Sequence, residues 1–175
     1  MAQINTPKEV LALAQKSATG KMQLPAGKTL LLAFLAGAYI AMGGLFSLMA
    51  GVGVPGGAEA PGLQRLLSGL VFPLGLILVV FAGAELFTGN NAVLVPGALG
   101  RRYGWGKVLR NWGLVYAGNF IGAAFFAYFL VVLPGVLSSE LWREAACNVA
   151  QAKVSMPWLT VFLRGVGANW LVCLA

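Results

Sequence analysis

The sequence predicts an all-α membrane protein, a bundle of helices in which the second membrane span is broken. Composition is the first reason: 59% of the 175 residues are hydrophobic and 10% are charged, against about 45–50% and about 25% in an ordinary soluble domain. The second reason is that four apolar runs approach the roughly 20 residues that cross a bilayer. The third is that one run, FAGAELFTGNN at 81–91, contains the carboxylate of Glu85 and then turns polar.

Hydropathy divides the chain into a polar N-terminal segment, residues 1–28, and a membrane domain, residues 29–175. The first segment is too polar for the apolar core of a signal peptide, so we expect no cleavage. Within it, Thr6, Pro7 and Glu9 form the pattern of a capping box that starts an amphipathic helix. The apolar face of this helix is expected either to dock on the bundle or to meet the membrane or the inner mouth. The spans of the second part are expected at 29–51, 66–95, 109–133 and 157 to the end.

The net charge of +7 follows the pattern of membrane topology. Loop 52–64 has no lysine or arginine, and loop 134–156 balances its basic residues with acidic ones. Because basic loops remain in the cytoplasm, the N-terminus and loop 97–110 are expected inside. Topology thus explains the positive charge, and we expect no nucleic-acid partner. The basic residues that decide this are Lys8, Lys16, Lys21, Lys28, Arg101, Arg102, Lys107 and Arg110.

The residue types that build metal and haem sites are scarce in this chain. It has no histidine and two cysteines, Cys147 in an outer loop and Cys173 deep in the fourth span. These positions do not suggest a disulfide, and neither a Cys/His metal site nor a bis-histidine haem site can be built. We therefore expect no metal, no cofactor and no enzyme activity.

Small residues in the first and third spans predict close helix packing. They are Gly37, Ala41, Gly44, Gly118 and Gly122. Asn119 lies between the last two glycines and is expected to donate a hydrogen bond across the contact. The aromatic side chains of the third span are expected to face lipid or neighbouring subunits, and they are Phe120, Phe125, Phe126, Tyr128 and Phe129.

The fourth span carries a charge, Arg164, and a polar residue, Asn169. A charge in mid-membrane normally faces the interior of a bundle or a water-filled path. Arg164 is therefore expected to line such a path, or to act structurally by pairing with Glu85 or capping carbonyl groups. The residues alone leave both alternatives open.

The polar residues of the second span predict a cavity or a pore wall. Non-helical backbone at membrane depth survives only where protein buries it or water reaches it. A break at 88–91 would present unpaired backbone groups and the partial charge of a half-helix to a passing solute. Thr88 adds a hydroxyl that can donate to an anion. Glu85 has the wrong charge for an anion site, so we expect it to support the break by accepting hydrogen bonds or by pairing with Arg164.

Two segments resemble the signature motifs of the formate/nitrite transporter family. VFAGAELFTG at 80–89 looks like the first motif, and GVGANWLVCLA at 165–175 resembles the second. Between them, NWGLVYAGNFIGA at 111–123 is similar to the third span of the family. The resemblance covers the whole chain and rests on two independent motifs in the expected order.

The resemblance implies an aquaporin-like helical bundle of six spans, assembled as a homopentamer in the cytoplasmic membrane of a bacterium or archaeon. Each protomer has its own pore for small monovalent anions, and an Ω-shaped loop, here 86–93, interrupts the second span. Leu86 matches an outer constriction, and Thr88 matches the loop threonine that bonds a central pore histidine. Lys153 matches a lysine that draws anions to the outer mouth, and Asn169 a polar residue beside the pore. The implied path residues are Leu86, Phe87, Thr88, Gly89, Asn90, Lys153 and Asn169.

Formate is the first candidate anion, and nitrite and hydrosulfide are the alternatives within the family. The sequence contains four of the six spans, so we interpret it as the N-terminal part of a channel whose pore histidine, absent here, would make passage pH-dependent. A membrane anchor subunit of a respiratory enzyme is the alternative from another class, but that role commonly needs haem-binding histidines. A neutral-solute channel of the aquaporin type is disfavoured because the spans have no Asn-Pro-Ala pair.

Overall fold

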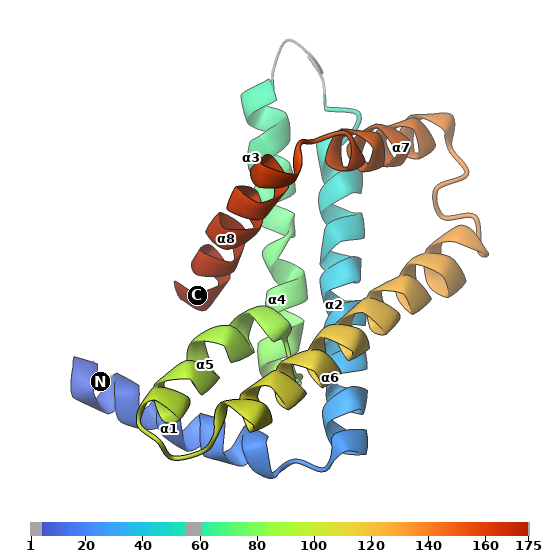
Figure 1. Ribbon diagram of the computed structural model, residues 1–175. Coiled ribbons are helices and arrows are strands. Elements are labelled where there is room, and N and C mark those ends of the chain that lie inside the picture. Colours follow the sequence, from blue (N-terminus) through green and yellow to red (C-terminus); the bar gives the residue numbers. More distant parts are fainter. Residues whose placement is uncertain (1–4, 55–60, 175) are drawn as a thin grey trace.

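The computed structural model describes residues 5–54 and 61–174, and within these ranges it contains helices and no strands. Figure 1 shows how the helices are arranged. Their bounds are α1 Pro7–Gln23, α2 Ala26–Gly51, α3 Pro61–Val71, α4 Pro73–Phe81, α5 Phe87–Leu99, α6 Trp105–Phe125, the π-helix η2 Phe126–Val132, α7 Glu140–Val154 and α8 Trp158–Leu174.

Three helical stretches of the described chain are long and apolar enough to cross a membrane: α2, α3 with α4, and α6 with η2. α2 is the centre of the bundle and packs against α6, α3 and α4, whereas α1 lies across one end of the bundle and contacts α5 and α6 (Figure 1). The expected fourth span is α8, which has 17 residues. It is joined to α7 at an angle of 109°, and the two count as a fourth span only when taken together.

The expected start of α1 is confirmed. The Thr6 amide donates to Glu9 Oε2 at 2.6 Å, and the Glu9 amide donates to Thr6 Oγ1 at 3.4 Å, which completes the capping box. The Thr6 amide, and then its hydroxyl, lower the pKa of Glu9 because they stabilise the carboxylate. α1 docks on the bundle through Ala18, which is buried with Leu94 and Val108.

Glycine allows α2 and α6 to pack closely, as expected. A methyl group on Gly37 would overlap the backbone of Asn119, and one on Gly122 would overlap the backbone of Phe34. The expectation is wrong for Gly44, where a methyl group would meet nothing within 4 Å. The neighbouring Gly43 makes the close contact instead, because it faces the junction of α3 and α4.

Two expectations about the segments after α6 are wrong. Phe126 is 7% exposed, whereas Phe120 is 68% exposed and could face lipid. The π-helix explains this, because its i→i+5 period turns Phe126 and Val131 to the same buried side. The expected outer loop 134–156 contains α7, which begins with Glu140 and ends near Lys153. Each charge lies at the end of the helix where the dipole favours it.

Candidate functional site

The second span is broken at residues 82–86, which we call the break. α4 ends because Gly83 adopts a left-handed conformation, with φ +60°. The Gly83 amide donates to Val80 O at 3.1 Å and the Ala84 amide to Val79 O at 2.9 Å, and Ala84 is buried with Val79. These contacts are those of a Schellman motif. The interruption is therefore confirmed, but the range 86–93 is wrong, since α5 begins at Phe87.

Gly83→Ala is expected to lower the free energy of unfolding by roughly 1–2 kcal/mol, the cost of a left-handed conformation for an L-residue. The effect is conformational, because a methyl group on Gly83 would meet nothing within 4 Å. Gly89→Ala is the control: its site in α5 is equally open but helical, so it should be neutral or slightly stabilising. Detergent-solubilised variants can be compared by thermal unfolding, and equal midpoints would contradict the assignment.

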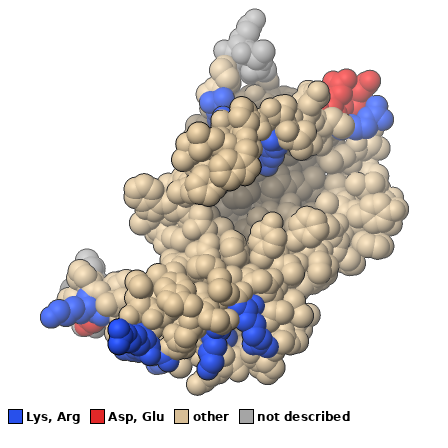
Figure 2. Space-filling view, in the orientation of Figure 1, with Lys and Arg blue, Asp and Glu red and all other residues tan. Residues whose placement is uncertain are grey.

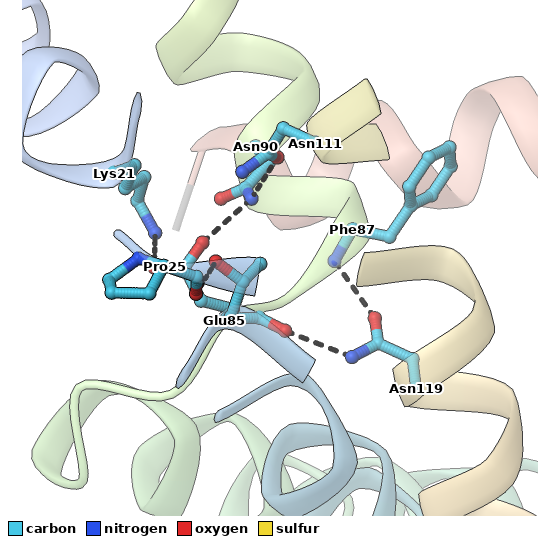
Figure 3. Close-up of polar contacts among 8 residues, drawn as sticks. Lys21, Pro25, Glu85, Phe87, Asn90, Asn111 and Asn119 are labelled. Carbon is cyan, nitrogen blue, oxygen red and sulfur yellow. Dashed lines mark hydrogen bonds and ion pairs between the residues drawn. The ribbon is translucent and has the colours of Figure 1, made fainter. Parts of the chain in front are cut away.

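The backbone of the break is tied to two neighbouring helices. The Glu85 amide donates to Leu32 O of α2 at 3.3 Å. Asn119 of α6 donates to Glu85 O at 2.9 Å and accepts from the Phe87 amide at 2.9 Å (Figure 3). The break is thus held on both sides. Three amides at its junction with α5, those of Leu86, Thr88 and Gly89, have no acceptor in the described chain.

Glu85 supports the break, but not through Arg164. Its carboxylate is 4% exposed and accepts from Lys21 Nζ of α1 at 2.7 Å (Figure 3). The second carboxylate oxygen accepts from Asn90 Nδ2 at 2.8 Å, and Asn90 also donates to Asn111 Oδ1 at 2.9 Å. Arg164 is exposed on α8 and forms no ion pair within the described residues. The pairing with Arg164 is wrong because α1 lies beside the break and brings Lys21 to it.

A chain of hydrogen bonds joins α5 to α8. Asn91 Nδ2 donates to Asn169 Oδ1 at 3.1 Å, and Asn169 Nδ2 donates to Cys173 Sγ at 3.4 Å. The Cys173 thiol in turn donates to Thr88 O at 3.2 Å. Two buried polar atoms here, Thr88 Oγ1 and Asn91 Oδ1, have no partner among the described residues. They remain available to a group that enters between α5 and α8.

Two cavities adjoin the start of α5. One, of about 840 Å³, lies between α1, α2, α4 and α5 and is lined by Lys21, Leu86 and Gly89, among others. The other, of about 970 Å³, lies between α5, α6 and α8, and Phe87 and Thr88 line it. Figure 2 shows a wide hollow in this face of the molecule, between the α7–α8 pair and α6.

The structure brings most of the expected path residues together. Leu86, Phe87, Thr88, Gly89 and Asn90 surround the start of α5, and Asn169 faces them from α8. Lys153 is the exception: it is exposed in the last turn of α7 and lines neither cavity. Four polar residues of the site were not among the expected path residues. A polar residue in an apolar span was a usable signal for three of them, but Lys21 lies in the polar N-terminal segment. The four residues are Asn91, Asn111, Lys21 and Cys173.

Residues 8–175 match the family described as formate/nitrite transporter. The chain belongs to the formate/nitrite transporter family. It is 43% identical over 169 residues to a probable formate transporter of Methanothermobacter thermautotrophicus, covering 89% of this chain and 62% of that protein. It is 34% identical over 171 residues to the formate channel FocA of Escherichia coli strain K12, covering 97% of this chain and 59% of that protein.

A solved structure, a pentameric formate channel with formate bound, has the same fold with a TM-score of 0.71. The two are 33% identical in sequence, and the match covers 85% of this chain and 58% of that one. The chain thus spans about three fifths of the length of each of these three relatives. Family membership and the apolar helices together make it an integral membrane protein.

Proposed function

We propose that the protein containing this chain is a channel that passes small monovalent anions, formate first, across the membrane. The observation that carries the proposal is the open N-terminus of α5, which directly follows the break. There the amides of Thr88 and Gly89 have no acceptor in the described chain, and the buried Thr88 hydroxyl has no partner. A helix N-terminus favours negative charge. The names of the relatives as formate transporter and formate channel support the same substrate.

In this proposal the path residues have different tasks. Leu86 and Phe87 narrow the path, while Gly89 leaves the backbone accessible at the start of α5. Thr88 donates to the anion, and Asn169 forms the α8 wall. Asn90 acts indirectly, because its side chain is held by Glu85 and Asn111. Nitrite and hydrosulfide, small anions of the same charge, are the alternative substrates.

The same proposal covers assembly and orientation. The pentameric relative supports a homopentamer, with exposed aromatic side chains of α6 and η2 available to lipid or neighbouring subunits. Lysine and arginine gather at the end of the molecule formed by α1 and the start of α6 (Figure 2). This distribution supports a cytoplasmic N-terminal segment, 1–28, below a channel domain, 29–175, in the cytoplasmic membrane of a bacterium or archaeon.

Flux in proteoliposomes tests the proposed function. The whole protein, purified and reconstituted, is expected to equilibrate formate by stopped-flow measurement across a range of pH. Liposomes without protein give the background rate. Absence of anion flux at every pH, from protein that is folded and inserted, would overturn the proposal.

Lys153→Ala is expected to lower anion flux at low ionic strength and much less at high ionic strength. Lys153 is exposed, and near a protein surface a charge attracts an anion ~4 Å away with about 4 kcal/mol before salt and desolvation reduce it. Lys153→Arg should retain most of the flux. Arg143→Ala is the matched control in α7, since Glu140 and Glu144 offset that charge. If Lys153→Ala equals wild type at low salt, Lys153 is merely a solvated lysine.

A further inference from the structure

One side chain, that of Asn119, joins three backbone groups around the break. Asn119 Nδ2 donates to Ala33 O of α2 at 2.8 Å and to Glu85 O at 2.9 Å. Asn119 Oδ1 accepts from the Phe87 amide at 2.9 Å. Both amide hydrogens and the oxygen are therefore used. The orientation of the side chain amide is determined, because the reverse one would place its oxygen against two carbonyl groups.

The two bonds to the break lie on either side of Leu86. This residue is extended, with φ −104° and ψ 128°, and connects the break to α5. Hydrogen bonds hold Glu85 O, before Leu86, and the Phe87 amide, after it. The backbone is therefore fixed on both sides of Leu86, and this sets the directions in which the Leu86 and Phe87 side chains leave the backbone. Leu86 faces the cavity of about 840 Å³ and Phe87 the cavity of about 970 Å³. Asn119 lines neither cavity.

The same face of α6 also holds the Phe87 ring. Tyr116 meets it edge-on with ring centroids 5.4 Å apart, and Trp112 does so at 6.3 Å. Residues 112, 116 and 119 are spaced four and three apart, so they lie on one face of the helix. That face therefore sets both the backbone direction and the ring position of Phe87.

Close helix packing fixes Asn119 itself. Gly37 of α2 lies against the Asn119 backbone so closely that a methyl group would overlap it, and Gly118 and Gly122 flank the same contact. The third hydrogen bond of Asn119, to Ala33 O, ends on α2 as well. The asparagine cannot shift without moving a whole span, so the break takes its position from the α2–α6 contact.

We propose that Asn119 is a positioning residue that sets the width of the anion path by fixing Leu86 and Phe87, without contacting the anion. This role of Asn119 rests on the proposed function, and it names the residue that determines the size of the largest anion that passes. Without the three hydrogen bonds, Leu86 and Phe87 can take other directions, and the path should accept larger carboxylates.

The test compares Asn119→Leu with wild type in the whole protein. Leucine has a similar size and forms none of the three hydrogen bonds. The ratio of formate flux to propionate flux in proteoliposomes is expected to fall by roughly fivefold, the change expected when one ordinary hydrogen bond no longer favours the narrow geometry. Ser47→Ala is the control. It also removes a hydrogen bond from a side chain to a backbone carbonyl group of another span, since Ser47 Oγ donates to Ser68 O at 2.9 Å, but this bond lies away from the break. It should leave the flux ratio unchanged.

A second measurement does not depend on anion flux. Cys173 lines the same cavity as Phe87. In a Cys147→Ser background, Cys173 is expected to react several-fold faster with the small neutral reagent methyl methanethiosulfonate when Asn119 is leucine, and at the wild-type rate when Ser47 is alanine. A wild type that passes no anion would overturn the proposed function alone. Unchanged flux ratio in a conducting Asn119→Leu variant, or an unchanged thiol rate in a folded one, would overturn the role of Asn119.

Discussion

Lys21→Met is expected to destabilise the protein by about 3–5 kcal/mol, the usual cost of removing one partner of a buried ion pair. The Lys21 ammonium lies 2.7 Å from Glu85 Oε1, and their side chains are 20% and 4% exposed. Methionine matches the length of the lysine stem but leaves the carboxylate with Asn90 as its remaining hydrogen-bond donor. Since Glu85 is in the break, the loss should loosen α1 and the start of α5 together.

A second substitution separates the charge from the packing. In Lys21→Met with Glu85→Gln, no charge is buried, and the glutamine can still accept from Asn90. The double variant is therefore expected to be more stable than Lys21→Met alone, because the cost of an unpaired buried carboxylate is removed. Lys28→Met is the control for removal of a lysine, because Lys28 is exposed and forms no ion pair in the described chain.

Unfolding of the detergent-solubilised protein, followed by circular dichroism, measures these differences. If Lys21→Met is as stable as the wild type, solvent screens the ion pair and the Glu85 carboxylate is not stabilised by Lys21. A double variant no more stable than Lys21→Met would show that methionine disturbs the packing of α1 rather than the charge of Glu85.

The sequence identified the broken span but misplaced the break. The polar run after Leu86 suggested non-helical backbone, because polar side chains are costly in a span. In the structure these residues begin α5, and the side-chain amides of Asn90 and Asn91 donate to Asn111 of α6 and Asn169 of α8. The actual stop signal is Gly83, one of 24 glycines in the chain. Nothing local distinguishes it from a packing glycine, because a Schellman motif depends on the hydrogen bonds that follow.

The partner of Glu85 could not be predicted for a related reason. Lys21 is separated from it by 64 residues, and hydropathy does not show where an N-terminal helix docks. Arg164 was the natural expectation because it is a charge within an apolar run, yet α8 leaves it exposed. The two family motifs contain Thr88 and Asn169, and in the structure both residues line the cavity between α5, α6 and α8. A motif carries information about tertiary contacts that periodicity lacks.

Gly37→Ala is expected to cost at least about 1–3 kcal/mol, the range for overpacking a close contact. The added methyl group would overlap the carbonyl group and Cα of Asn119. Backbone cannot turn aside as a flexible side chain can, so α2 and α6 must separate. Gly44→Ala is the matched control two turns along α2, where nothing lies within 4 Å. It should be neutral or slightly stabilising, because alanine favours a helix more than glycine does.

Gly122→Ala should resemble Gly37→Ala, because its methyl group would overlap the backbone of Phe34 across the same helix contact. If one separation of α2 and α6 relieves both overlaps, the double variant Gly37→Ala with Gly122→Ala will cost less than the sum of the single variants. Detergent unfolding of the four proteins measures this. Additive costs would mean that each overlap is relieved locally, and a Gly37→Ala variant as stable as Gly44→Ala would contradict the close contact itself.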